Sequence, residues 1–290
     1  MADRISGSIP PSTGGPARDP ARAVLEATLA EALSAGSRPH SSAPPAHSSP
    51  RPSPSAAPPA SRASAPPGRP GVVTVALVHN EPPPGPPRLP FVQNPDSPAA
   101  AAFRVLRHKL RQVDSPRTIA ITSPNAREGK TTCAIDLAMA LTEHGRAKVL
   151  LVEANFRAPH VSVALGFSPP SCFGAQMASH MKTPSAPWQV TSAFFPNLHV
   201  LAVDPESVGQ WVLNAPAFKA AMEQFQAADY QHIIVDCPHA LGSADVNVIE
   251  DFTDGVLMTA AAGKTSSASL QDAARHLAPV NILGVVLMHR

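Results

Sequence analysis

The chain has 290 residues, and its charges nearly cancel, with 23 Lys and Arg against 21 Asp and Glu. Its three cysteines are widely spaced and form no CxxC pair, which argues against a disulfide framework or a zinc site and fits a reducing cytosol. No run of apolar residues approaches the 18 needed for a membrane-spanning helix, and the N-terminus has no signal-peptide pattern, so the sequence predicts neither a span nor secretion.

The first 96 residues are predicted to be a disordered region rich in Pro, Ala and Ser. Residues 1–98 hold 23 of the 35 prolines and a single aromatic residue, Phe91, so they cannot bury enough apolar surface to offset their ordering entropy. Leucines at 25, 29 and 33 predict a short helix at 20–34, which is either a docking segment for a groove or a transient helix of the tail. An apolar run at 72–78 suggests a strand that joins an edge of the folded part.

Residues 97–290 are predicted to fold as one α/β domain with a mostly parallel sheet covered by helices on both faces. Apolar runs, which predict buried strands, alternate with patterns of helical period, and this alternation is typical of such sheets. The expected strands are 118–122, 148–153, 198–203, 233–236, 256–260 and 282–288. The expected helices begin at 97, 130, 216 and 266.

A phosphate-binding loop is predicted between the strand at 118–122 and the helix that begins at Lys130. Residues 127–132 read Arg127, Glu128, Gly129, Lys130, Thr131 and Thr132. Gly129 lets the backbone close on phosphates, Lys130 can reach the β and γ groups of a nucleotide, and the Thr131 hydroxyl can bind Mg²⁺. Pro124 stands where the full pattern has its first glycine. The loop predicts binding of ATP with Mg²⁺ through these six residues.

A second apolar strand, 233–236, ends in Asp236, which is the arrangement that holds a metal ion through a carboxylate at a strand tip. The alternative is an aspartate that caps the following loop. His239 follows three residues later and is interpreted as a histidine of an exposed loop rather than as a ligand.

These motifs, together with Glu153, Asn155 and Arg157 at the end of the strand 148–153, resemble those of the bacterial tyrosine kinases (BY-kinases) within the MinD/ParA-like P-loop ATPases. The resemblance extends from about Ser97 to Arg290 and includes the helix with Arg104 and Arg107 and the run from Ala262 to Thr265. It implies that Glu153 is the catalytic base, that Lys130 and Asp236 assist it, and that Arg157 joins the nucleotide site. It also implies a metal site at Thr131 and Asp236.

The same resemblance implies a cytoplasmic protein that takes part in exopolysaccharide biosynthesis or export. A membrane-embedded activator of the polysaccharide copolymerase type would act on it in trans and hold it at the inner face of the membrane, and self-association is possible in this family.

Several residues depart from the family pattern. Arg127 replaces a glycine, Asn155 replaces a carboxylate, and Ala101 replaces the glutamate of the helix that assembles subunits. Tyr230 is the only tyrosine, so the chain has no tyrosine cluster to phosphorylate. Two further hypotheses therefore stay open. In the first alternative to an active kinase, the chain is a non-catalytic pseudokinase that binds partners in the same assembly. In the second, it is a ParA/MinD-type positioning ATPase. The neutral folded part makes nucleic acid an unlikely partner for the latter.

Overall fold

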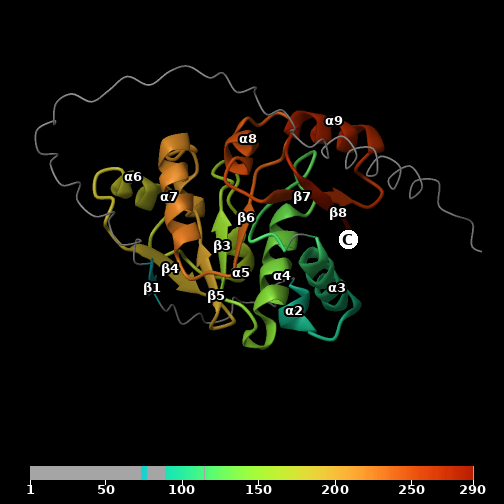
Figure 1. The fold of residues 1–290 in the computed structure, drawn as a ribbon, viewed down its shortest axis with the longest axis horizontal. Helices are drawn as coiled ribbons and strands as arrows, with labels where there is room; N and C mark the ends of the chain where they lie inside the picture. Colours follow the sequence, from blue (N-terminus) through green and yellow to red (C-terminus); the bar gives the residue numbers. More distant parts are fainter. Residues whose placement is uncertain (1–72, 77–88, 114, 290) are drawn as a thin grey trace, which may run out of the picture.

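The computed structural model describes residues 73–76, 89–113 and 115–289 (Figure 1). The predicted helix at 20–34 lies outside this part of the chain. The strands are β1 (Val73–Ala76), β2 (Thr118–Thr122), β3 (Val149–Glu153), β4 (Trp188–Ser192), β5 (Leu198–Leu201), β6 (His232–Asp236), β7 (Gly255–Ala261) and β8 (Ile282–Met288). The α-helices are α2 (Pro90–Gln93), α3 (Pro98–Gln112), α4 (Lys130–Thr142), α5 (Val161–Leu165), α6 (Phe173–His180), α7 (Ala215–Ala227), α8 (Asp245–Glu250) and α9 (Ser267–Leu277). Two short 3₁₀ turns span Glu143–Gly145 and Pro205–Ser207.

The strands form one 8-stranded sheet in the order β1-β4-β5-β3-β6-β2-β7-β8. All neighbouring strands are parallel except β4 and β5, so the predicted mostly parallel sheet is confirmed. The strand expected near 72–78 is β1, which pairs with β4 at an edge of the sheet. β3, β6 and β2 lie side by side at the centre, so the loops after these strands meet at one end of the sheet.

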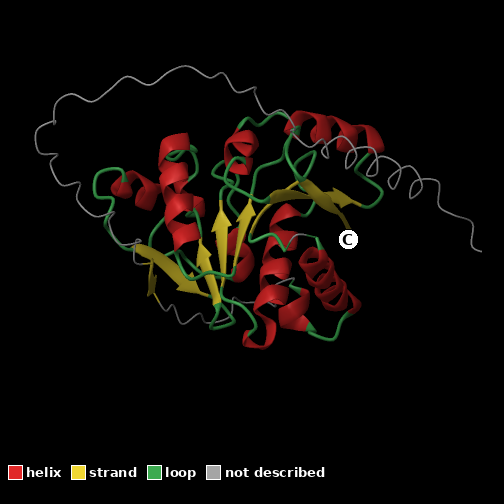
Figure 2. Cartoon of the chain, in the orientation of Figure 1, coloured by secondary structure: helices red, strands yellow, loops and turns green. Residues whose placement is uncertain are grey.

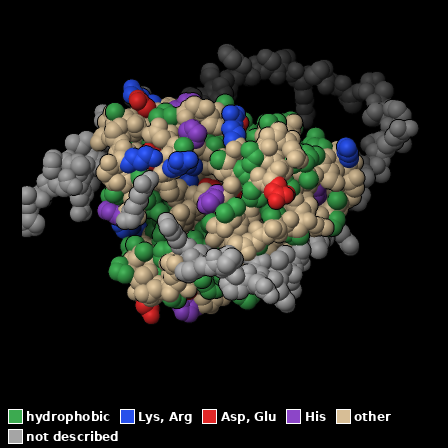
Figure 3. All heavy atoms as spheres, turned by 180° about the vertical axis from the view of Figure 1, so that it is seen from behind, with side chains coloured by type: hydrophobic (Ala, Val, Ile, Leu, Met, Phe, Trp, Pro, Cys, Tyr) green, Lys and Arg blue, Asp and Glu red, His purple; other side chains and the backbone are tan. Residues whose placement is uncertain are grey.

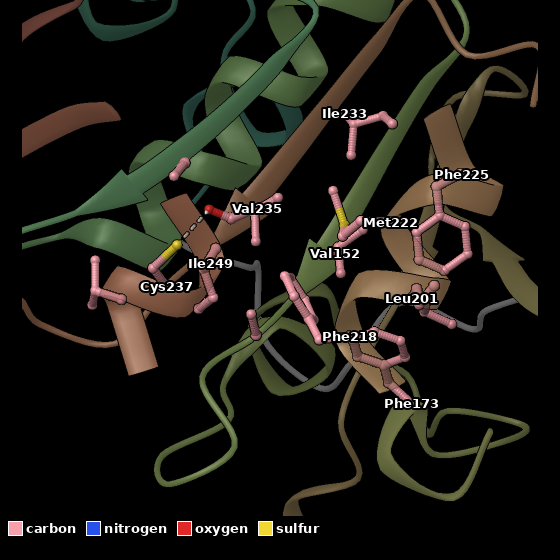
Figure 4. Close-up of a cluster of buried hydrophobic side chains, with 14 of the residues drawn as sticks. Val152, Phe173, Leu201, Phe218, Met222, Phe225, Ile233, Val235, Cys237 and Ile249 are labelled. Carbon is pink, nitrogen blue, oxygen red and sulfur yellow. Dashed lines mark hydrogen bonds between the residues drawn. The ribbon is translucent and has the colours of Figure 1, made fainter. Parts of the chain in front are cut away.

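Helices cover the sheet on both faces (Figures 1 and 2). The buried side chains of α2, α3, α4 and α5 belong to one apolar cluster, and those of α6, α7, α8 and α9 belong to the other. The second cluster is rich in aromatic rings. Figure 4 shows Phe173, Phe218 and Phe225 around Met222, next to strand residues such as Val152 and Val235. The domain is therefore a three-layer α/β fold.

The packed part of the chain begins before the predicted boundary at Ser97. Leu89 and Phe91, which flank the first residue of α2, are 3% and 4% exposed and belong to the core on the α4 face. The Arg104 guanidinium lies 5.4 Å from the centre of the Phe91 ring, which ties α2 to α3. The prediction that residues 89–96 are disordered is corrected, because two large apolar side chains there are enough to anchor a single helical turn.

Candidate functional site: a phosphate-binding loop

The predicted phosphate-binding loop connects β2 to α4. Gly129 caps α4 in the left-handed conformation, with φ of +88°, and Arg127 also has a positive φ, +61°. Such a φ costs a residue with a Cβ roughly 1 kcal/mol, which the loop accepts at Arg127. The Arg127 side chain is exposed, so its guanidinium is available to a phosphate. Below it, Lys130 opens the helix and is 7% exposed.

Glu128 is the internal brace of this loop. Its carboxylate is buried and accepts hydrogen bonds from the backbone N–H of Asn125 at 2.8 Å, from the Asn125 amide at 3.2 Å and from the Thr265 hydroxyl at 2.8 Å. Lys264 adds a bond from its ammonium group to the Ala126 carbonyl, at 3.2 Å. The Glu128 side chain thus holds the shape of the loop, and only its backbone can contribute to phosphate binding. The role of Thr265 and Lys264 was not predicted, although their run had been noted as a point of resemblance.

Thr131 and Asp236 are brought together as the predicted metal pair. The Thr131 hydroxyl donates to Asp236 Oδ2 at 2.7 Å, while Asp236 Oδ1 is buried and makes no hydrogen bond. Burial raises the pKa of Asp236 to about 6, against the Thr131 hydrogen bond and the Lys130 charge, which lower it. Mg²⁺ usually takes one or two protein oxygens and completes its octahedron with waters and phosphates. The hydroxyl and the free carboxylate oxygen fit that requirement, and Mg²⁺ there would neutralise phosphate charge.

Burial also acts on Lys130, whose pKa it lowers, while the negative charges of Asp236 and Glu128 oppose that shift. His239, interpreted from the sequence as a loop histidine, lies in the same electrostatic environment. Burial lowers the pKa of His239, the positive charge of Lys130 lowers it further, and Glu128 acts in the opposite direction. The N–H of Ala240, the residue after His239, donates to the Ser123 carbonyl at 2.8 Å, so the loop after β6 lies beside the phosphate loop.

Glu153 does not have the environment expected of a catalytic base. Its side chain is fully buried, and its two oxygens accept three backbone N–H bonds, from Val161 at 2.8 Å, from Val203 at 2.9 Å and from His160 at 2.5 Å. Burial raises its pKa to about 8, although the three N–H groups favour the charged form. Because both oxygens accept backbone N–H bonds and the side chain is buried, Glu153 joins the loops after β3 and β5.

The other predicted residues after β3 are also occupied elsewhere. The Asn155 amide donates to the Ala158 carbonyl at 2.9 Å, which closes its own loop. Arg157 is exposed and pairs with Asp245 of α8 at 3.2 Å. Thr132 is exposed on α4 and lines a groove beside β8, away from the Thr131–Asp236 pair. The structure thus brings Gly129, Lys130, Thr131 and Asp236 together. Glu153 lies beside Asp236, because the two residues are partners in the pairing of β3 with β6, but its carboxylate is engaged by the loops after β3 and β5.

The sheet, its strand order and the loop at its carboxyl end define a P-loop α/β fold. No protein-family model matches the chain. Tyrosine-protein kinase YwqD of Bacillus subtilis is 27% identical over 198 residues, which are 67% of this chain and 82% of that protein.

Solved structures with the same fold include the chimerical protein CapA2B2, with a TM-score of 0.59 and 21% identity over 70% of this chain and 90% of that one. The kinase domain of the Escherichia coli tyrosine kinase ETK has a TM-score of 0.56 and 20% identity, over 69% and 79% of the two chains. The resemblance to the BY-kinases is therefore confirmed in both sequence and fold.

Proposed function

We propose that this chain is a nucleotide-binding BY-kinase relative that holds ATP and Mg²⁺ at the phosphate loop. The observation that carries the proposal is the 2.7 Å bond between Thr131 and Asp236, with the second Asp236 oxygen buried and unpaired. A buried carboxylate oxygen without a donor is costly unless a cation or donor binds it. Lys130 stands at the first position of the same helix, where it can meet the phosphates.

The biological setting follows from the resemblance. We propose that the chain is cytoplasmic and acts in exopolysaccharide biosynthesis or export, with a membrane-embedded copolymerase-type activator in trans. No helix in the described part of the chain has the length and apolar character of a membrane span. Arg104 and Arg107, which the resemblance assigns to subunit contacts, both bond Glu143 of their own chain, so self-association would need other contacts.

A titration of Mg²⁺-ATP into the full chain, followed calorimetrically, tests nucleotide binding. Lys130→Ala and Asp236→Asn are each expected to weaken affinity at least tenfold, because each removes a charge aimed at phosphate or metal. Lys219→Ala is the matched control, since this exposed lysine of α7 pairs only with Glu223 one turn away. Equal affinity of the parent chain and its three variants for Mg²⁺-ATP would reject the proposal. A parent chain that binds no Mg²⁺-ATP, even when an activator fragment is present, would reject it as well.

A non-catalytic form of this protein is the second candidate, and a specific observation favours it. Glu153 is buried and accepts three backbone N–H bonds, and Asn155 is neutral and bound to its own loop. If the defect is this extensive, the double variant Asn155→Asp, Arg127→Gly should bind Mg²⁺-ATP and still produce no ADP. Turnover that appears in the double variant would instead identify a kinase limited by those two positions alone.

A further inference from the structure

An apolar groove runs along α3 on the side that faces β8. Its volume is about 800 Å³, and Phe103, Leu106 and Leu110 of α3 line it together with Leu283, Val285 and Leu287 of β8. Three large apolar side chains at this groove are well exposed: Val105 at 55%, Val113 at 47% and Leu287 at 48%. A strip of this kind, shared between a helix and an edge strand, suits an amphipathic helix laid into it.

The groove reaches the phosphate loop. Thr132 and Asp136 of α4 line its floor, so it touches the helix that begins at Lys130. At its β8 end lies Met288, which packs so closely on Gly129 that a Cβ there would be 2.9 Å from the Met288 Cγ. Whatever fills the groove therefore lies against elements that shape the nucleotide site.

The electrostatics of the groove favour a ligand with acidic flanks. Arg104 and Arg107 of α3 pair with Glu143, whereas Lys109 and Arg111 are exposed, and no residue from Ser97 to Val113 is acidic. Lys109 lines the groove itself. Figure 3, which views the molecule from behind, shows more Lys and Arg side chains in its left half than in its right half.

Residues 20–34 of the same chain have the matching chemistry. At helical spacing Leu25, Leu29 and Leu33 form one stripe, which Glu26 borders. From Asp19 to Ser34 the segment has three acidic residues against one basic residue, Arg22. Arg22 falls at the end of the leucine stripe, and Asp136 is the acidic side chain among those that line the groove. A helix of 15 residues is about 22 Å long, the length of α3.

The connecting chain is long enough for this segment to reach the groove. β1 and β8 are the opposite edges of the sheet, seven strand spacings apart, or roughly 34 Å at about 4.8 Å each. The 38 residues between positions 34 and 73 have a root-mean-square span of about 34 Å even as a flexible coil, and more than 100 Å when extended. The connecting chain therefore does not need to stretch for residues 20–34 to reach the groove. Because the segment and the groove belong to one chain, their high effective concentration favours docking.

We propose that residues 20–34 dock as a helix in the groove between α3 and β8, with the leucine stripe against the apolar walls. The helix covers Val105, Val113 and Leu287 and lies over the contact between Met288 and Gly129. The tail is then an intramolecular ligand of the nucleotide-binding domain, displaceable by any partner helix that fits the same groove.

Cysteine cross-linking in the full chain tests the proposal. Ala32→Cys and Ala102→Cys are introduced together with Cys172→Ser, because the other two native cysteines are buried. A short bismaleimide is expected to link positions 32 and 102 within one chain at least tenfold faster than it links Ala32→Cys to Glu223→Cys. Position 223 is exposed on α7, on the opposite face of the sheet, and reports random collisions of the tail.

Further variants distinguish docking through the leucine stripe from random contacts of a tethered tail. Leu25→Asp with Leu33→Asp is expected to abolish the fast cross-link, because it places two charges against the apolar walls. Ala27→Asp, on the far side of the same helix, should leave the rate unchanged. The proposal is overturned by equal rates at 102 and 223, by a rate insensitive to the stripe variants, or by products that are dimers, which would assign the groove to a second copy.

Discussion

The carboxylates around the phosphate loop differ in what their oxygens contact, and those contacts decide their roles. Glu128 and Glu153 have both oxygens engaged by donors of the fold, whereas Asp236 keeps one oxygen free beside Lys130. The sequence places all three residues correctly after a strand or in the loop. It could not predict which of them the backbone saturates, because that depends on N–H groups 50 residues away, such as that of Val203.

Glu153→Gln is expected to destabilise the domain by about 2 kcal/mol. The amide has one acceptor oxygen, so its NH₂ group must face a backbone N–H, and a buried donor is left without a partner. Urea unfolding at pH 7 measures the loss, with Asn155→Ala as the control for a change in the adjacent loop. If Glu153 were a base exposed to substrate, the variant would lose turnover while keeping its full stability.

Asp136 of α4 is buried, and neither of its oxygens has a hydrogen-bond partner. Burial raises its pKa to about 7. The folded state therefore binds this proton more tightly than the unfolded chain, so the stability contributed by protonation is complete in acid and is lost as the pH rises towards 7.

Asp136→Asn removes this titration. The variant should gain stability relative to the parent as the pH rises from 5 to 8, by on the order of 1–3 kcal/mol. Thermal unfolding across that range measures the difference, and Asp229→Asn, at an exposed carboxylate, is the control. A difference in stability that stays constant with pH would show that Asp136 is ionised at pH 5 in the folded protein.

At the scale of elements, the contact between α3 and the end of α4 depends on one cluster of charges. Arg104 Nε lies 2.9 and 3.0 Å from the two Glu143 oxygens, and Arg107 bonds both Glu143 and the Ala140 carbonyl. The two arginines thus provide hydrogen-bond donors both to a carbonyl in the last turn of α4 and to the Glu143 carboxylate. The two arginines were predicted from the family resemblance as subunit contacts, but Glu143, which engages them, lies outside that motif and was not foreseen.

A double-mutant cycle with Arg104→Met and Glu143→Gln should give a coupling of about 1 kcal/mol, because the bond is bidentate and only partly exposed. Hydrogen bonding to Arg104 holds the pKa of Glu143 below its ordinary value. The coupling is therefore present at neutral pH and should disappear as the pH falls through that lowered pKa. Urea unfolding at pH 7 and in acid measures both. Additive single effects at pH 7 would mean that the pair does not join the two helices.

The long elements were predictable, while the short ones depend on contacts distant in sequence. The periodic patterns located β2, β3, β6, β7, β8, α3, α4, α7 and α9 within a few residues. No expected element corresponds to α2, α5, α6, α8 or β4. β4 is held by the Gln176 side chain, whose amide group bonds Gln189 at both ends, and by the indole of Trp188 on Gln224. Hydrogen bonds to distant side chains produce no hydrophobic pattern in the 5 residues of β4, so this strand could not be predicted from the sequence.

At the scale of the whole molecule, the packed domain begins earlier than the predicted boundary at Ser97. The average composition of residues 1–98 is rich in proline, so it gives no sign that Leu89 and Phe91 belong to the core. Both side chains are buried on the α4 face, and Phe91 also lies under Arg104. We expect the domain to need α2, so that its functional start is Leu89 rather than Ser97.

Two truncated chains distinguish these starts. A chain that begins at Leu89 keeps α2, and one that begins at Ser97 loses two side chains whose burial contributes about 1.5–3 kcal/mol each, so it should be less stable by roughly 3 kcal/mol or more. In the full chain, Phe91→Ala should cost a similar amount, about 3 kcal/mol, whereas Val92→Ala, at a partly buried neighbour, should cost less. Urea unfolding of all four proteins measures these differences. Equal stability of the two truncated chains would restore the boundary at Ser97, because α2 would then be a passenger on the surface of α3 and α4 and not part of their core.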